Sequence, residues 1–266
     1  MSDRSYLFVP GNRPQRFDKA IASGADVVIL DLEDAVAASD KDPARDAIRG
    51  WLDAARPVYL RLNAADTRWF AADLQLARLP GVAGIVLPKA ENAEAIREIH
   101  LRAGPTVKII PLIETALGLW RVEAVASAPG VVRLAFGSVD FQLDTGITGE
   151  REELLFARSQ LVLVSRVAGL LPPVDGVSVA LDDEAALRRD VAQSRSMGFG
   201  GKLAIHPKQV RPINEGFLPQ PAEITWAQQV MTAAGASGDN AVRLDGKLID
   251  RPLIDRARAL LAGTAG

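Results

Sequence analysis

Eight short apolar runs, separated by longer amphipathic stretches, constrain the fold of this chain more than any other feature of its sequence. Most of the runs are rich in leucine or β-branched residues, and few alternate polar with apolar residues, which is typical of parallel strands buried on both faces. Helical patterns lie between them, so that strand and helix alternate about eight times, the count of an α/β fold of the (β/α)8 TIM barrel type. The predicted strands are 6–9, 27–32, 58–62, 84–87, 107–113, 131–136, 176–181 and 202–205.

The main rival to a barrel is an open, doubly wound sheet, but no GxGxxG motif follows the first run. From about Phe217 the alternation ends, and a helix-like stretch is followed by a predicted hairpin over 242–250 with Asp245 and Gly246 at its turn. We therefore expect a barrel core over 1–216 and a C-terminal helical and hairpin extension over 217–266, which would pack on a neighbouring subunit.

Composition narrows the class of protein. The 266 residues are 48% hydrophobic and carry a net charge of -2, which allows a large core and gives no electrostatic footprint for nucleic acid. No apolar run approaches the roughly 20 residues that span a bilayer, and no signal peptide is recognisable. The absence of cysteine excludes disulfides, thiolate zinc sites and cysteine nucleophiles. We expect a cytoplasmic protein that binds neither nucleic acid nor membrane.

Polar and charged residues follow nearly every predicted strand. In a TIM barrel the chemistry lies at the carboxyl ends of the strands, so these side chains should converge. Their convergence, rather than any one of them, indicates a functional site. The residues are Asn12 and Arg13, Asp31, Glu33 and Asp34, Arg61 and Asn63, Pro88 and Lys89, Glu114, then Gly137, Ser138 and Asp140, and finally His206.

The run 27–34, VVILDLED, places three carboxylates directly after four apolar residues. Crowded carboxylates repel one another unless a positive group compensates them. Glu114 and Asp140 follow neighbouring strands, and a pair of carboxylates suits Mg²⁺, which takes one or two of them and keeps several waters. The pattern alone leaves open that Glu114 and Asp140 instead cap the helices that follow them.

Two further residues have alternative interpretations. Arg61 follows an extended run and could fork onto a carboxylate or carbonyl of a substrate, or it could form a structural ion pair with Asp31 or Glu33. His206 could act as a base, although a histidine before proline is more often a packed, hydrogen-bonded residue. With two histidines and no GxSxG motif, a Ser-His-Asp triad is not expected.

Seven motifs occur in a fixed order along the chain: RSYLFVPGNRPQRFDKA, ADVVILDLEDAV, VYLRLN, GIVLPKAE, IIPLIETALGL, RLAFGSVDFQLDTG and GKLAIHPKQV. Together they resemble the citrate lyase beta-subunit-like family of the aldolase and citrate lyase superfamily. The resemblance runs from about residue 4 to 215, with a further match near 245–252. It implies a TIM barrel, usually assembled as a trimer or hexamer.

The activity that the resemblance implies is a Mg²⁺-dependent carbon–carbon lyase. Such an enzyme cleaves or forms a 3-hydroxy-acid thioester, such as malyl-, citramalyl- or citryl-coenzyme A, with an acyl thioester and an oxo acid as the other partners. Three alternatives remain: a citrate lyase beta subunit acting on a carrier-protein thioester in a complex, a pyruvate-type aldolase, and a non-catalytic barrel that serves as a partner. Asp34 argues against the aldolase, because those relatives tend to carry histidine there.

The resemblance also implies roles for individual residues. By motif, Glu114 and Asp140 match the metal ligands, and Glu33 and Asp34 match the shell around the metal-bound water. Arg61 matches the arginine that contacts the substrate. The remaining assignments are Gly137, Ser138 and Pro88 in the substrate site, Arg13, Arg16 and Lys19 at the phosphates of coenzyme A, and Asp250 as a base supplied by a neighbouring subunit.

Overall fold

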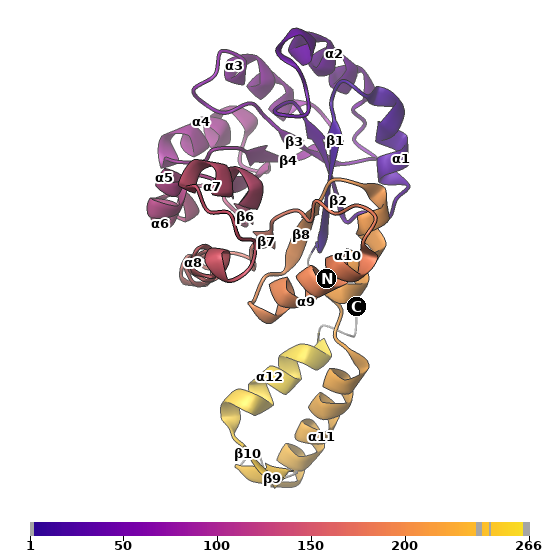
Figure 1. Ribbon diagram of the computed structural model, residues 1–266, viewed down its shortest axis with the longest axis vertical. Helices are drawn as coiled ribbons and strands as arrows, with labels where there is room; N and C mark the ends of the chain where they lie inside the picture. The colour runs from indigo at the N-terminus through magenta and orange to yellow at the C-terminus, as the bar shows by residue number, and fades with distance from the viewer. Residues whose placement is uncertain (1–2, 238–240, 245, 263–266) are drawn as a thin grey trace. The chain divides into compact units, whose positions relative to one another are not determined.

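The computed structural model describes residues 3–237, 241–244 and 246–262, and the chain forms two compact units that divide between Glu215 and Gly216. The first unit is a closed barrel of eight parallel strands in sequence order, as the TIM barrel prediction requires. Figure 1 shows these strands enclosed by helices. The strands are β1 Ser5–Pro10, β2 Val27–Asp31, β3 Val58–Arg61, β4 Val82–Leu87, β5 Lys108–Ile113, β6 Ala135–Phe136, β7 Val174–Asp175 and β8 Gly201–Ala204.

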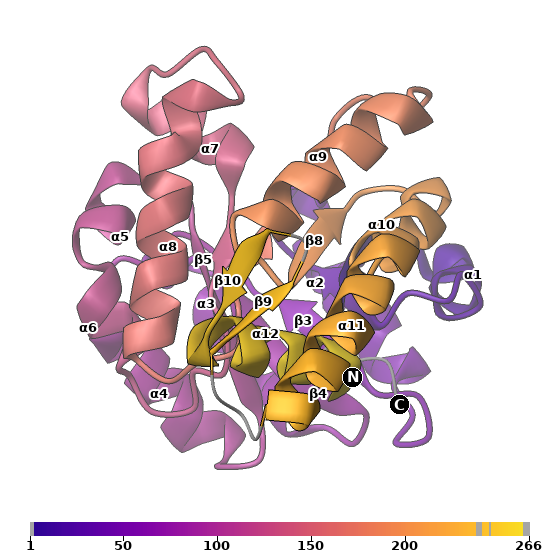
Figure 2. The ribbon, with the colours of Figure 1, turned by 90° about the horizontal axis from the view of Figure 1, so that it is seen from below.

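Helices cover the outside of the barrel, and α8 packs beside α6, as the view in Figure 2 shows. Each long helix begins near a predicted helical pattern; α4, for example, is capped by Asn92, whose side chain accepts the N–H of Ala95. The helices are α1 Phe17–Ile21, α2 Lys41–Trp51, α3 Phe70–Asp73, α4 Ala93–Ala103, α5 Ala116–Trp120, α6 Val122–Ala126, α7 Ser138–Thr145, α8 Leu155–Val167, α9 Glu184–Ser196 and α10 Val210–Gly216.

The interior of the barrel is filled by apolar side chains from alternate strand positions, among them Ile29, Ile110 and Leu203. The intervening side chains of β2 are buried against the helices, so that all five of its residues are buried. Burying a side chain of this size contributes about 1.5–3 kcal/mol, which explains why these runs are apolar throughout. The prediction of parallel strands buried on both faces is therefore confirmed for β2.

Two predicted strands differ from the structure. In the run 131–136 only Ala135 and Phe136 form β6, and the predicted strand 176–181 is wrong, because β7 is Val174–Asp175. The N–H of Val174 donates to the carbonyl of Leu134, and β7 pairs with β8 in parallel. A strand this short, with prolines before it and an aspartate within it, lacks the apolar composition from which strands are predicted. The residues that follow it, including the exposed Val179, form a loop instead.

The second unit consists of α11 Pro221–Ser237, the strands β9 Val242–Leu244 and β10 Lys247–Ile249, and α12 Arg251–Ala262. It has its own apolar core, which includes Val230, Ile249 and Ile254. The predicted hairpin is confirmed by antiparallel pairing of β9 with β10. At its expected turn, Gly246 has the positive φ of +78°, while Asp245 lies outside the described residues.

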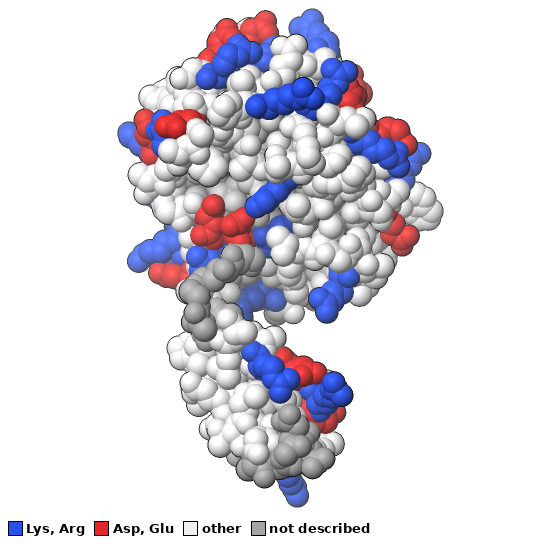
Figure 3. Space-filling view, turned by 180° about the vertical axis from the view of Figure 1, so that it is seen from behind, with Lys and Arg blue, Asp and Glu red and all other residues white. Residues whose placement is uncertain are grey.

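Two further features bear on the class of protein. No helix within the described ranges is long and apolar enough to cross a membrane. Lysine and arginine side chains are interspersed with aspartate and glutamate on the face of the barrel drawn in Figure 3. A mixed surface of this kind does not resemble the single-sign basic stripe that nucleic-acid-binding proteins present.

Candidate active site

A cavity of about 310 Å³ lies at the carboxyl ends of the barrel strands. Phe8 of β1 and Leu203 of β8 contribute apolar lining, while the polar lining comes from residues that end or follow four other strands. These polar residues are Asp31 at the end of β2 and Asp34 after it, Arg61 at the end of β3, Glu114 after β5, and Ser138 and Asp140 after β6. The cavity therefore brings together about half of the residues that the strand-end argument singled out.

Arg61 is held between two carboxylates. Its Nε donates to Asp31 Oδ1 at 2.7 Å and its Nη2 to Asp31 Oδ2 at 2.6 Å, while its Nη1 lies 2.9 Å from Glu33 Oε2. Burial disfavours the charge, but Asp31, Glu33 and Glu114 together outweigh burial and raise the pKa of Arg61. The guanidinium stays charged and fixed, and it stacks over the Phe8 ring at 4.6 Å. The ion-pair interpretation of Arg61 is correct, and it does not exclude a contact with substrate.

Glu114 is 2% exposed, and its Oε1 accepts the backbone N–H of Lys89 at 2.8 Å. Burial, reinforced by the carboxylate of Glu33, raises the pKa of Glu114 to about 8. The helix that follows is capped by Thr115, whose Oγ1 accepts the N–H of Gly118 at 3.0 Å. Thr115 therefore caps this helix, and the Glu114 carboxylate, which does not, lines the cavity.

Two other acids beside the cavity also have raised pKa values, mainly because they are buried. Burial raises the pKa of Glu33 to about 7, although Arg61 opposes the shift. Burial and the nearby Asp34 raise the pKa of Asp140, which lies in the first turn of α7. Each of these carboxylates disfavours the negative charge of its neighbours. A cation bound among them would therefore stabilise their charged forms.

Mg²⁺ fits this donor set better than a metal that needs a closed cage. Across residues 3–237, 241–244 and 246–262, no group of three or more Asp, Glu, His or Cys side chains is arranged to hold a metal. Mg²⁺ commonly binds through one or two carboxylates and keeps several waters. Other carboxylates nearby can accept hydrogen bonds from those waters. Glu114 and Asp140 would be the ligands, with Glu33 and Asp34 beside them.

Gly137 is required by the position of the Glu114 carboxylate. A Cβ atom on Gly137 would lie 2.4 Å from Glu114 Oε2 and 2.5 Å from Glu114 Cβ, which is closer than non-bonded atoms approach. The N–H of Gly137 donates to the carbonyl of Ile113 at 2.9 Å, which fixes this glycine against β5. The close approach explains why a glycine begins the α7 motif.

The remaining predicted residues lie in different surroundings. Pro88 is buried and is not among the residues that line the cavity. Arg13, Arg16 and Lys19 are exposed around the 3-10 turn Pro14–Arg16 and α1, close in sequence to Pro10, which lines the cavity. Asp250 follows β10 in the second unit, where its carbonyl accepts the N–H of Ile254.

His206 has the structural role that its sequence context favoured. It precedes the 3-10 turn Pro207–Gln209, and its Nδ1 accepts the N–H of Lys208 at 3.1 Å. A capping box with Gln209 completes the turn. His206 is therefore a capping residue.

Two lysines lie beside the acidic cluster: Lys41, which the sequence did not single out, and Lys89, which follows β4 and belongs to the predicted strand-end set. Lys41 is 5% exposed, and its Nζ donates to the carbonyls of Leu32 at 2.7 Å and Glu33 at 2.8 Å. Lys89, with φ of +46°, is a non-glycine residue in the left-handed region, a conformation that costs about 1–2 kcal/mol. No sequence signal marks Lys41, because it lies within a helical pattern. The position of Lys89 after a strand predicts its place near the site, but not the contacts that it makes with residues of other strands.

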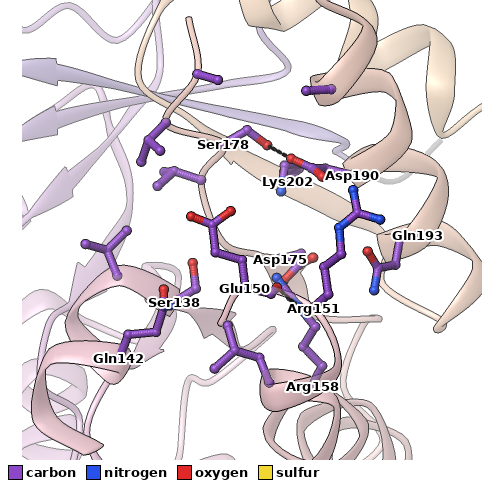
Figure 4. Close-up of a pocket in the computed structure, with 16 residues that line it drawn as sticks. Ser138, Gln142, Glu150, Arg151, Arg158, Asp175, Ser178, Asp190, Gln193 and Lys202 are labelled. Carbon is purple, nitrogen blue, oxygen red and sulfur yellow. Dashed lines mark hydrogen bonds and ion pairs between the residues drawn. The ribbon is translucent and has the colours of Figure 1, made fainter. Parts of the chain in front are cut away.

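A second cavity of about 160 Å³ also has Ser138, Val139 and Val177 in its lining (Figure 4). Its buried charges are satisfied mainly by the fold: Arg158 Nε lies 3.1 Å from Asp175 Oδ1, and Lys202 Nζ donates to the carbonyl of Gly176 at 2.6 Å. These side chains belong to β7, β8 and α8, so the charges tie the outer face of the barrel to a helix.

The raised pKa values predict how metal-free protein responds to pH. Glu33 and Glu114 have folded pKa values of about 7 and 8, above the ordinary value of 4.5, so the folded state binds more protons than the unfolded state between these limits. Stability is therefore present at pH 5 and decreases as pH rises towards 8, by at most about 1.4 kcal/mol per pH unit for each proton. Urea unfolding of chelator-treated protein from pH 5 to 8 measures this slope. Stability that rises over the interval contradicts the assignment.

Comparison with known proteins relates this site to a family. Residues 4–207 match the family model described as HpcH/HpaI aldolase/citrate lyase. A citrate lyase subunit beta-like protein of Deinococcus radiodurans is 35% identical, over 98% of this chain and 97% of the relative. A (3S)-malyl-CoA thioesterase of Cereibacter sphaeroides is 34% identical, over 97% of this chain and 93% of the relative.

A solved structure extends the comparison to ligands. The crystal structure of the protein CitE from Mycobacterium tuberculosis, in complex with magnesium, acetoacetate and coenzyme A, superposes with a TM-score of 0.88. The two sequences are 32% identical, and the match covers 100% of this chain and 99% of that one. That relative therefore holds a metal, an oxo acid and coenzyme A on the same fold.

Proposed function

Because this chain belongs to the HpcH/HpaI aldolase/citrate lyase family, we propose that it is a Mg²⁺-dependent carbon–carbon lyase acting on a 3-hydroxy-acid thioester. Malyl-, citramalyl- and citryl-coenzyme A are the candidate substrates, and the products would be an acyl thioester and an oxo acid. The observation that carries the proposal is the cluster of Arg61, Glu114 and Asp140 in one cavity at the strand ends.

The proposed reaction needs a bound metal ion and a positive charge near the substrate, and residues of this chain can provide for both. Bound Mg²⁺ would act as a Lewis acid on oxygens of the oxo acid. Glu114 and Asp140 are proposed to hold it, and Glu33 and Asp34 to orient its waters. Arg61, fixed by Asp31, would stabilise negative charge that develops on the substrate, at no cost in reorganisation.

Cleavage also needs a base that removes the proton of the substrate hydroxyl. The electron pair of the breaking carbon–carbon bond then passes to the thioester as an enolate, and protonation at carbon gives the acyl thioester. We assign the base to Asp250, supplied by a neighbouring subunit of a homo-oligomer, trimeric or hexameric. Exposed apolar side chains on α7 and α8, including Leu143, Phe156 and Val167, support an assembled state.

The base assignment predicts a separation of binding from turnover. Asp250→Ala should retain Mg²⁺ and oxo-acid affinity but lose about 10²–10⁴-fold in kcat, the usual contribution of a general base. Asp255→Ala, which removes an exposed acid of α12, is the matched control and should keep its activity. Calorimetric binding and steady-state kinetics test both. Full activity of Asp250→Ala would place the base elsewhere.

The function itself is tested with a panel of malyl-, citramalyl-, 3-methylmalyl- and citryl-coenzyme A, each assayed with Mg²⁺ and again with EDTA. We expect metal-dependent release of an oxo acid from one member. The malyl-CoA thioesterase relative favours a second candidate, hydrolysis, which would release free thiol and leave the carbon–carbon bond intact. Measuring oxo acid and free thiol in the same reaction separates the two. If neither oxo acid nor free thiol is released, a carrier-protein thioester as substrate or a non-catalytic barrel would be favoured.

Coenzyme A is expected to meet the exposed cations Arg13, Arg16 and Lys19 with its phosphates. Gly137 and Ser138, which line the cavity, are proposed to contact the oxo acid. Pro88 is buried and does not line the cavity, so we propose that it affects substrate binding only through the turn that it shares with Lys89.

A further inference from the structure

The cations that face the acidic cluster are not equally available to a substrate. Arg61 lines the cavity, and Lys89, which is outside the lining, donates its N–H to Glu114, which lines it; both charges also lower the pKa of Asp140. Two N–H donors of the Arg61 guanidinium are hydrogen-bonded to Asp31, and its Nη1 forms a further ion pair with Glu33 Oε2 at 2.9 Å. Its charge is correspondingly matched by two carboxylates. A new anion would have to compete with both of them.

Lys89 is in the opposite position. Its side chain is 48% exposed, and its Nζ lies 3.9 Å from Glu33 Oε1, beyond hydrogen-bond distance. No hydrogen bond of this ammonium to another described residue is found, so its three donors remain available to a ligand. Lys41, the other lysine beside the cluster, is buried and bonded to two carbonyls.

The backbone of Lys89 connects this half-exposed cation to the proposed metal ligand. Its left-handed φ of +46° accompanies the hydrogen bond from its N–H to Glu114 Oε1 at 2.8 Å. Strained backbone of this kind persists where the surrounding structure imposes it, and it concentrates at functional sites. One residue therefore holds the Glu114 carboxylate through its main chain and extends an ammonium group beside Glu33.

We propose that Lys89 is a substrate-binding residue, whose ammonium pairs with the carboxylate of the oxo acid, while its strained main chain positions Glu114. The inference rests on the proposed function for the identity of the ligand. It assigns the anion-binding role to the half-exposed Lys89 and leaves Arg61 as the fixed cation that stabilises developing charge.

The test separates the side chain from the backbone with three variants. Lys89→Met removes the charge, Lys89→Arg keeps it, and Lys89→Gly removes the side chain while accepting the left-handed conformation without strain. Lys108→Met, at the exposed start of β5, is the matched control for the loss of one positive charge. The dissociation constants of pyruvate and oxaloacetate in Mg²⁺, and of Mg²⁺ alone, are measured by calorimetry.

We expect Lys89→Met and Lys89→Gly to weaken oxo-acid binding about tenfold, and Lys89→Arg to stay within about threefold of the wild type, as a directly paired charge requires. Mg²⁺ alone should bind the Met and Gly variants no more weakly, because a repelling cation has been removed. The thermal midpoint of Lys89→Gly should not fall below that of the wild type. Lys108→Met should match the wild type throughout.

Unchanged oxo-acid affinity in Lys89→Met would overturn the inference, as would an equal weakening of Mg²⁺ and oxo-acid binding, which would indicate a structural role. Wild-type protein that binds neither oxo acid would overturn it as well. A silent thioester panel combined with Lys89-dependent oxo-acid binding would overturn only the proposed function and leave the role of Lys89 in place.

Discussion

Replacing Glu114 by glutamine is expected to abolish Mg²⁺ binding and the oxo-acid binding that depends on it, while the barrel stays folded. Glutamine keeps the shape of the side chain but removes the charge that a hard cation needs. Because the Glu114 carboxyl is buried among other acids and has a pKa of about 8, it is mostly uncharged at neutral pH without metal, and a neutral glutamine replaces it without an electrostatic penalty; above pH 8 the substitution also relieves repulsion. The variant should therefore be at least as stable as the wild type without metal, and it should lose the stabilisation that Mg²⁺ confers.

Titration calorimetry with Mg²⁺ and thermal unfolding with and without Mg²⁺ measure both effects. Asp140→Asn should behave in the same way, since it removes the second proposed ligand. Glu123→Gln, which alters an exposed glutamate of α6, is the matched control and should leave binding unchanged. If Glu114→Gln and Asp140→Asn both keep the Mg²⁺ affinity of the wild type, the cation binds elsewhere.

Replacing Arg61 by methionine is expected to have the largest effect on stability. The change leaves Asp31 and Glu33, which are 1% and 6% exposed, without their shared cation. Removing one partner of a buried ion pair costs about 3–5 kcal/mol at neutral pH, because a buried charge remains uncompensated. Turnover should be lost as well, since the proposed stabilisation of developing charge is removed.

Urea unfolding at pH 7 measures the stability loss, and Arg49→Met is the control. Arg49 pairs with Asp46 on the surface of α2, with both side chains about half or more exposed, and such a pair contributes about 0–1 kcal/mol. The double variant Arg61→Met with Asp31→Asn should recover part of the loss, because it removes one of the two stranded charges. A loss no larger than that of Arg49→Met would show that Arg61 does not compensate Asp31 and Glu33.

The barrel was predictable because its signal is repeated: each buried strand carries the same apolar composition, and each is followed by an amphipathic helix. The prediction was wrong at β7, where pairing with β6 and β8 makes a strand of two residues that include a buried aspartate. The run 176–181 has the composition of a strand, but it has no pairing partner among the described strands. Strand identity there depends on neighbours that local composition does not reveal.

The candidate site was predictable to the extent that strand order determines it. Glu114, Asp140 and Arg61 converge because a parallel barrel brings every carboxyl end to one rim. The contacts that Lys41 and Lys89 make are set by side-chain reach and by one unusual φ angle, neither of which leaves a periodic trace in sequence. Arg61 illustrates the same limit, since its ion pairs and its proposed catalytic role use the same residue type.

The contact between Gly137 and Glu114 has a consequence for how this site could decay over evolutionary time. The space that a methyl group at 137 would need is occupied by Oε2 and Cβ of Glu114, the residue that directly follows β5. A glycine-to-alanine change at 137 therefore displaces the proposed metal ligand, at some cost to the main chain where β5 ends. Among relatives, a side chain at this position would indicate that the acid after the fifth strand is no longer positioned for metal binding and that the activity has been lost.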